Sequence, residues 1–130
     1  MKLLLDTHIF LWFISGDKRL SKTMCDSICD LNNEVYLSVV SIWEATIKHQ
    51  LGKLPLPQSP EIYLPLQRER HQISSLSLDE ASVCLLANLP PIHRDPFDRM
   101  LICQAIHYGF TIVTVDDFIG KYSIPIFGNA

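Results

Sequence analysis

Short apolar runs alternate along the chain with longer segments in which apolar residues recur every three or four positions. The short runs are typical of buried strands, and the longer segments are typical of amphipathic helices. Strands are predicted at residues 2–6, 35–39, 73–76, 111–115 and 124–127. Helices are predicted at residues 7–15, 21–31, 41–51, 60–71, 78–88, 96–108 and 116–122. This alternation favours an α/β sandwich with a mainly parallel sheet.

Capping residues mark the ends of several of these helices. Asp95 is a good N-cap, Pro96 suits the first helical position, and Gly109 ends the same helix. Two further starts match the capping box, in which Ser or Thr precedes Glu by three positions. They are the segments 41–44 and 77–80, each of which begins with Ser and ends with Glu.

Helical periodicity also predicts which side of each helix faces the core. In residues 21–31 this side consists of Met24, Ile28 and Leu31. In residues 78–88 it consists of Ala81, Cys84 and Leu85. In the central helix, 96–108, the apolar face contains Phe97, Leu101, Ile102, Ala105 and Ile106, and the opposite face contains Arg99, Cys103, Gln104 and His107.

The composition is that of an ordinary globular protein, with 130 residues, 48% hydrophobic and 19% charged. We therefore expect residues 1–130 to form one domain. The apolar run at residues 3–5 is too short for a signal peptide or a membrane span, so a cytoplasmic protein without membrane association is expected. The net charge of −3 excludes a generic basic coat for nucleic acid. The four cysteines lie in predicted helices without CxxC spacing, which favours reduced thiols.

Four acidic residues lie where strands end or helices begin. Asp6 ends the first strand, and Glu44 lies in the first turn after the second strand. Asp98 begins the central helix, and Asp116 follows the strand at residues 111–115. In a parallel sheet each helix begins at the carboxyl edge of the strand before it, which is where ligands bind. All four carboxylates are therefore expected at one edge.

Each acid also has a purely structural interpretation. Asp6 and Asp116 match simple N-caps. Glu44 fits a capping box, and Asp98 favours the helix dipole. Glu44 can also pair at the surface with Lys48, four residues on, a contact worth a few tenths of a kcal/mol. Glu44 nevertheless shares its helical stripe with three apolar residues, Val40, Ile47 and Leu51. A cap alone does not require that buried position.

Electrostatic repulsion favours a cation at an edge where carboxylates converge. Two carboxylates about 4 Å apart repel by roughly 4 kcal/mol at an effective dielectric constant of about 20. Converging acids therefore take up protons or bind a cation. Carboxylate ligands without a matching Cys or His set favour Mg²⁺ or Mn²⁺. Such a site is suited to phosphodiester hydrolysis, with one ion or with two.

The chain resembles the PIN domain family, and specifically its VapC-type toxin ribonucleases. The resemblance is carried by four segments in the expected order, at residues 4–8 (LLDTH), 41–44 (SIWE), 93–101 (HRDPFDRML) and 114–116 (TVD). It implies a three-layer α/β/α fold, a Mg²⁺ or Mn²⁺ cofactor and endoribonuclease activity. It also implies that the chain is the toxin of a toxin–antitoxin pair, inhibits translation and growth, forms a homodimer and is inhibited by a cognate antitoxin protein.

The resemblance assigns roles to individual residues. Asp6, Glu44 and Asp98 match the family's first three catalytic, metal-binding acids. Asp116 matches the fourth, which is more variable, and Asp117 can substitute for it. Asp95 belongs to the same motif but is interpreted as a helix cap. Three hydroxyl side chains are expected to support the acids: Thr7, Ser41 and Thr114.

Three basic residues beside the predicted site are candidates for binding RNA phosphates: His93, Arg94 and Arg99. Solvated or paired side chains are the structural alternative for the arginines. Trp12 and Trp43 are expected in the core or at an interface, because each falls among apolar neighbours. The RNA is expected to be cut in an unpaired segment. Exposed apolar surface on the first helices, or around residues 63–66, is expected to receive the antitoxin.

Other classes of protein fit the sequence less well. A receiver-type signalling domain needs an acidic pair after the first strand and an Asp near the middle of the chain, and neither is present. A phosphatase with an aspartyl nucleophile needs a second Asp at position 8, where this chain has His. A catalytically silent PIN-like module that binds RNA or a partner remains the alternative to the enzyme.

Overall fold

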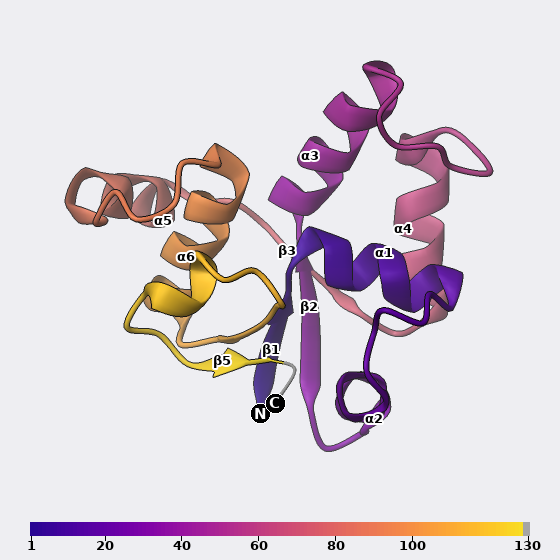
Figure 1. Ribbon diagram of the computed structural model, residues 1–130, viewed down its shortest axis with the longest axis horizontal. Helices are drawn as coiled ribbons and strands as arrows, with labels where there is room; N and C mark the ends of the chain where they lie inside the picture. The colour runs from indigo at the N-terminus through magenta and orange to yellow at the C-terminus, as the bar shows by residue number, and fades with distance from the viewer. Residues whose placement is uncertain (129–130) are drawn as a thin grey trace.

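The computed structural model describes residues 1–128, in which a five-stranded sheet carries helices on both faces (Figure 1). The strands are β1 (Lys2–Leu5), β2 (Glu34–Ser38), β3 (Ser74–Leu76), β4 (Thr111–Val113) and β5 (Ile126–Phe127). Their order is β3-β2-β1-β4-β5, and each neighbouring pair is parallel. The expected α/β/α fold is confirmed, with a sheet that is wholly parallel over the described residues.

The helices cover the two faces of the sheet unequally. They are α1 (Thr7–Ser15), α2 (Lys22–Cys29), α3 (Val39–Gln50), α4 (Pro60–Arg70), α5 (Glu80–Cys84) and α6 (Pro96–Tyr108), with short 3₁₀ helices η1 (Leu85–Asn88) and η2 (Ile119–Lys121). Figure 1 shows α1, α2 and α4 on one side of the sheet and α5 and α6 on the other, while α3 contacts both α4 and α6.

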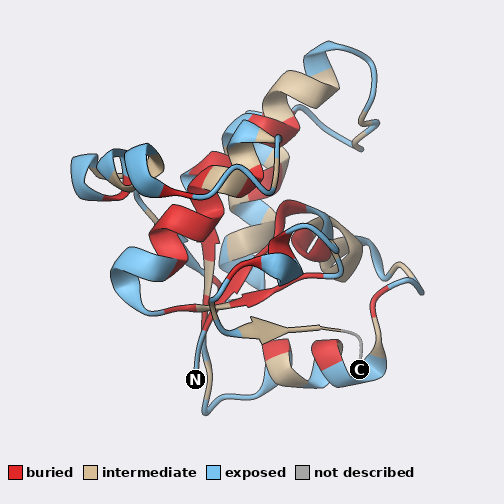
Figure 2. Cartoon of the chain, turned by 60° about the vertical axis from the view of Figure 1, so that its left-hand side comes forward, coloured by how far each residue is buried: buried red, intermediate tan, exposed pale blue. Residues whose placement is uncertain are grey.

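The alternation of side chains along β1 explains how the sheet supports two cores. Leu3 and Leu5 belong to the core under α1, α2 and α4, whereas Leu4 belongs to the core under α6. All three side chains are fully buried, and Figure 2 shows buried residues along the strands in the middle of the molecule. Strands of a parallel sheet that are buried on both faces consist of continuous apolar runs, as β1 does.

The order of the strands fixes where a ligand site can form. From β1 the chain moves outward through β2 to β3, and it then returns through α5 and α6 to β4, on the other side of β1. The carboxyl ends of β1 and β4 therefore flank the point at which the direction of winding reverses. In open α/β sheets this switch point is the preferred position for ligands.

Two predicted helix starts are wrong, because residues other than the expected ones cap these helices. The helix expected from Ser41 begins at Val39, and the Ser38 hydroxyl caps it by accepting a hydrogen bond from the Val40 backbone N–H at 3.0 Å. The helix expected after Ser77 is capped by Asp79, which accepts from the Ser82 N–H at 2.9 Å. Both capping boxes were therefore misassigned.

The predicted inward faces of two helices also need correction. Helix α2 ends at Cys29, before Leu31, a residue that is 92% exposed. Helix α5 buries Ser82, and Ala81 and Cys84 are exposed.

The central helix is buried on more sides than a single apolar face allows. In α6, Cys103 and Gln104 are fully buried although they were assigned to the polar face. Ile106, assigned to the apolar face, is instead 48% exposed. The reason is packing on two sides, because α6 contacts β4 as well as α3, α5 and η1. The Gln104 side chain donates a hydrogen bond to the Ser77 carbonyl at 3.2 Å.

The four cysteines are free thiols, as expected. Within residues 1–128, no helix combines the length and apolarity needed to cross a membrane.

Candidate functional site

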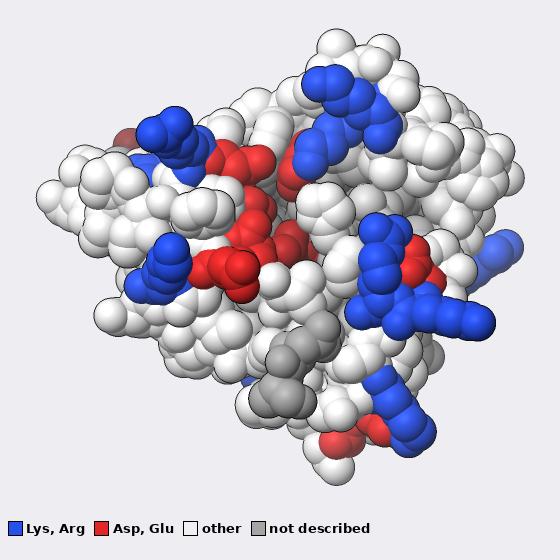
Figure 3. All heavy atoms as spheres, in the orientation of Figure 1, with Lys and Arg blue, Asp and Glu red and all other residues white. Residues whose placement is uncertain are grey.

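Acidic side chains gather in a hollow on one face of the molecule, and Lys and Arg side chains surround it (Figure 3). The four predicted acids come from different elements. Asp6 follows β1, Glu44 lies in α3, Asp98 lies in the first turn of α6, and Asp116 follows β4. Asp98 and Asp116 both lie within 3.3 Å of the His93 Nε2, and the charges of Asp6, Glu44 and Asp116 all raise the pKa of Asp98.

Asp6 is both a helix cap and a buried acid. Its side chain accepts a hydrogen bond from the His8 backbone N–H at 3.4 Å, which caps α1. It also accepts from the Thr114 hydroxyl at 2.7 Å, across the switch point between β1 and β4. Asp6 is only 3% exposed, and burial raises its pKa above the usual value. The cap interpretation therefore holds, but it does not account for the burial.

Glu44 is the most buried of the four acids, at 1% exposure. Its Oε2 lies 2.5 Å from the Lys48 Nζ, so the expected ion pair forms, but around a buried carboxylate and not at the surface. Its Oε1 is also buried and has no hydrogen-bond partner among the described residues. A buried carboxylate oxygen without a partner is costly, and it points to a group that is added on binding.

Asp98 lies beside a separate cap. Asp95 caps α6, as predicted, by accepting hydrogen bonds from the backbone N–H groups of Phe97 at 2.8 Å and of Asp98 at 3.1 Å. The Asp98 side chain is thereby left free for the cluster. Burial, followed by the charges of neighbouring acids, raises the pKa of Asp98 to about 8.

The fourth acid in the cluster is Asp116. Its Oδ1 accepts from the backbone N–H groups of Phe118 at 2.8 Å and Ile119 at 3.0 Å, and it also lies 3.3 Å from the His93 Nε2. His93, Asp98 and Asp116 each offer a ligand atom within 4.8 Å of the others. Asp117 is exposed and lies outside this group among the described residues.

The three predicted hydroxyl side chains are buried beside the acids. Thr114 binds Asp6 directly, as described above, and its Oγ1 also accepts from the Asp116 N–H at 3.0 Å. Thr7 donates to the Ser41 hydroxyl at 2.8 Å, which ties the start of α1 to α3. These bonds fix the spacing of the elements that carry Asp6, Glu44 and Asp116.

The three predicted RNA-binding residues are placed differently from one another. Arg94 is exposed beside the site. Arg99 donates to the carbonyls of Pro90 at 3.3 Å and His93 at 3.1 Å, so its guanidinium is partly engaged. The His93 imidazole lies inside the acidic cluster, with its side chain 10% exposed. Sequence patterns did not indicate that position, because spacing along the chain says nothing about which way a loop histidine turns.

The cluster fits a divalent cation. Its carboxylates are mutually repulsive, two of them have raised pKa values, and Glu44 Oε1 is buried without a partner among the described residues. An oxygen-rich set of this kind suits a hard ion.

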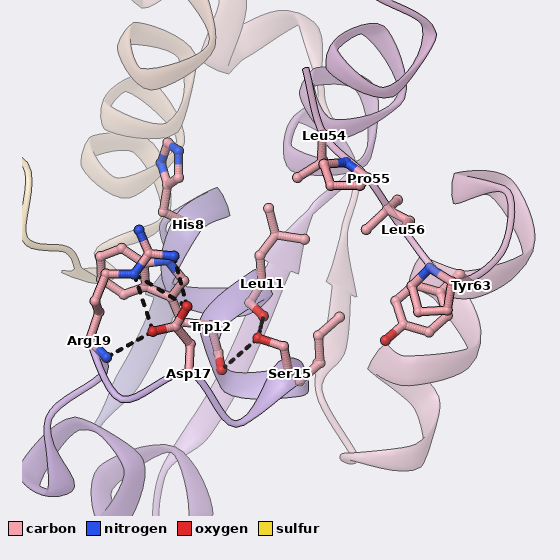
Figure 4. A pocket seen from close by; sticks show the side chains of 12 residues that line it. His8, Leu11, Trp12, Ser15, Asp17, Arg19, Leu54, Pro55, Leu56 and Tyr63 are labelled. Carbon is pink, nitrogen blue, oxygen red and sulfur yellow. Dashed lines mark hydrogen bonds and ion pairs between the residues drawn. The ribbon is translucent and has the colours of Figure 1, made fainter. Parts of the chain in front are cut away.

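A second hollow of about 280 Å³ lies between α1, the loop at residues 52–58 and α4 (Figure 4). Its lining includes the apolar side chains of Leu11, Ile14, Leu54, Leu56 and Tyr63. One end carries Asp17 and Arg19, whose guanidinium also stacks on Trp12. This apolar groove lies between the first helix and the region around residues 63–66. One of these two surfaces was predicted from the sequence to receive the antitoxin.

Comparisons of sequence place the chain among known proteins. A model of the PIN domain family matches residues 3–123. The chain is also 42% identical over 52 residues to Ribonuclease VapC16 of Mycobacterium tuberculosis. That alignment covers 40% of this chain and 37% of the relative, so it spans well under half of either protein.

Comparisons of structure find the same fold in solved complexes. VapBC2 from Rickettsia felis, bound to a DNA fragment from its promoter, matches with a TM-score of 0.74 and 14% identity, over 98% of each chain. DNA-bound VapBC from Salmonella typhimurium matches with a TM-score of 0.67 and 15% identity, also over 98% of each chain. At these identities the likeness concerns the fold.

Proposed function

The chain belongs to the PIN domain family, and we propose that it is a metal-dependent endoribonuclease, the toxin of a toxin–antitoxin pair. One observation carries the proposal. Four carboxylates from separate elements converge at the switch point of the sheet, with the pKa of Asp98 raised to about 8. Repulsion between these carboxylates does not stabilise the fold, so their arrangement indicates a functional site.

Mg²⁺ or Mn²⁺ is the ion that these residues suit best. Asp6, Glu44 and Asp98 would hold it, with Asp116 at the margin. When bound, such an ion supplies Lewis-acid chemistry, activating water and offsetting negative charge on the scissile phosphodiester. Thr114, Thr7 and Ser41 keep the carboxylates in position through the hydrogen bonds described above.

RNA is the proposed substrate, although the chain is acidic overall. The Lys and Arg side chains around the acidic hollow provide local positive charge (Figure 3), and Arg94 is exposed beside it. Contacts with the phosphate backbone would position the strand, and an unpaired segment would allow the phosphodiester to reach the recessed carboxylates.

The proposed inhibitor is a cognate antitoxin protein in the bacterial cytoplasm. The VapBC complexes named above have this fold. We propose that an apolar segment of the antitoxin fills the apolar groove, and that the toxin, a single domain over residues 1–130, is a homodimer. Tyr63→Asp in the groove should abolish binding of the antitoxin, whereas Ile62→Asp, on the exposed part of α4, should not.

Mapped cleavage of total RNA by the antitoxin-free protein tests the enzymatic proposal. Wild type and Asp98→Asn are compared in Mn²⁺ and in chelator, with Asp117→Asn as the matched control. We expect discrete cuts that require metal, are lost in Asp98→Asn and persist in Asp117→Asn. If the folded wild type makes no cuts, the chain is instead a silent RNA-binding or partner-binding module.

A further inference from the structure

His93 is the one nitrogen-bearing side chain in the group formed with Asp98 and Asp116, and the acid set alone leaves it unexplained. Its Nε2 lies 2.9 Å from Asp98 Oδ2 and 3.3 Å from Asp116 Oδ1. The Nε2 is buried and forms no hydrogen bond that meets the usual geometry among the described residues. One N–H that lies near two acceptors can be shared between them in a three-centre hydrogen bond.

The His93 ring is held in place from several sides. The Asp95 backbone N–H donates to its Nδ1 at 3.1 Å. The His93 backbone N–H donates to the Tyr122 hydroxyl at 2.9 Å, and that hydroxyl donates to the Pro90 carbonyl at 2.7 Å. The Phe118 ring lies against the imidazole, with centroids 5.4 Å apart. A ring fixed in this way presents Nε2 to the carboxylates in one orientation.

The bond at Nδ1 decides which ring nitrogen carries the proton. Because Nδ1 accepts the Asp95 N–H, its lone pair is in use, and the proton of the neutral imidazole is on Nε2. A protonated Nε2 cannot coordinate a metal ion. It can only donate, and the acceptors within reach are Asp98 Oδ2 and Asp116 Oδ1.

We propose that His93 is a positioning residue that shares its Nε2–H between Asp98 and Asp116 and holds their carboxylates toward the bound ion. This inference rests on the proposed metal site. It assigns to His93 a role that neither RNA binding nor direct ligation describes. The ligands remain oxygen atoms, so the preference for a hard ion is kept although a histidine lies in the cluster.

Two substitutions at position 93 distinguish a hydrogen-bond donor from a direct metal ligand. The amide nitrogen of Gln reaches about as far as the imidazole Nε2, so His93→Gln retains a donor, whereas His93→Ala removes it. The affinity for Mn²⁺ of each folded variant is measured in the absence of RNA, by electron paramagnetic resonance of the free ion. His107→Ala, at the far end of α6, controls for the loss of an imidazole. Thermal unfolding in chelator verifies that each variant is folded.

We expect His93→Ala to bind Mn²⁺ about 10 to 100 times more weakly, as for other residues that orient ligands, and His93→Gln to stay within about threefold of wild type. The Mn²⁺-loaded wild type should show no ¹⁴N coupling of the strength that a directly coordinated imidazole gives.

Two results would overturn the inference while leaving the metal site intact. One is wild-type affinity in His93→Ala, and the other is strong ¹⁴N coupling with equal losses in both His93 variants. Failure of the wild type to bind Mn²⁺ at all would refute the metal site itself, and the role of His93 with it.

Discussion

Replacing Asp98 by Asn should stabilise the metal-free protein at neutral and alkaline pH. The Asp98 side chain is 13% exposed, and its pKa is raised from 3.8 to about 8, first by burial and then by the charges of Asp6, Asp95, Glu44 and Asp116. Asparagine has nearly the same shape and does not ionise. The substitution therefore removes the free-energy cost of ionising this buried carboxyl, and it opens no cavity.

The sign and size of the effect follow from proton linkage. Between pH 3.8 and pH 8 the folded protein keeps the Asp98 proton that the unfolded chain has lost. Stability is therefore greatest at low pH and falls as the pH rises through this window. Between pH 5 and pH 8 the free energy of unfolding falls by about 1.4 kcal/mol per pH unit, or by roughly 4 kcal/mol at most over the whole interval.

Urea unfolding in chelator at pH 5 and at pH 8 measures this loss. With a denaturant slope of about 1–3 kcal/mol per M, the wild-type midpoint should fall by roughly 2 M. Asp98→Asn should lose much less, and its residual slope would reflect Asp6, whose pKa is also raised.

Asp117→Asn is the control, because Asp117 is an exposed neighbouring acid outside the cluster. It should follow the wild-type profile. Parallel pH profiles for wild type and Asp98→Asn would refute the reasoning, since Asp98 would then ionise in the folded protein as easily as in the unfolded chain.

Three further outcomes are expected from the same contacts. Lys48→Met leaves the buried Glu44 without its counter-ion, so the metal-free protein should lose roughly 2 kcal/mol in urea unfolding. Adding Glu44→Gln should restore most of this loss, and no recovery would contradict the prediction. Gly109→Ala should cost about 1 kcal/mol in thermal unfolding, because Gly109 has φ 73°, while Gly120→Ala should cost little. Mn²⁺ at 100 times its dissociation constant should stabilise wild type by about 2.7 kcal/mol in a thermal-shift assay and leave Asp98→Asn unchanged; an equal shift in both would place the ion elsewhere.

The features that could be predicted from the sequence are those with strong local signals. The central helix was delimited correctly, because Asp95, Pro96 and Gly109 each have a distinct capping role, and the structure shows all three in those roles. The apolar run at residues 3–5 correctly indicated a buried strand, which the structure places between β2 and β4. Convergence of the acids followed from the rule that places helix starts at the carboxyl edge of parallel strands.

Predictions from local sequence were wrong where tertiary packing determines which residue caps a helix or which side of a helix is buried. Ser38 and Ser41 both precede α3 in a plausible way, and the structure uses Ser38 as the cap and Ser41 as a partner for Thr7. Gln104 was assigned to a polar face by its chemistry, but packing on both sides of α6 buries it. Neither choice is encoded in the spacing of residues along one helix.

The candidate site was incomplete for a similar reason. Lys48 was predicted as a partner for Glu44, but the burial of Glu44 depends on how α3 packs against α1, α4 and α6. His93 was predicted to bind an RNA phosphate because it is a basic residue beside the predicted site. Its orientation toward Asp98 depends on Tyr122 and Phe118, which lie far along the chain.

We propose that RNA cleavage requires a divalent ion held by the acidic cluster. The most direct test measures the initial rate of cleavage of one RNA against free Mn²⁺, beside the dissociation constant of Mn²⁺ obtained independently on the same protein. We expect no cleavage in chelator and half-maximal cleavage near that dissociation constant. Full cleavage in chelator, or none with the site saturated, would contradict the proposal.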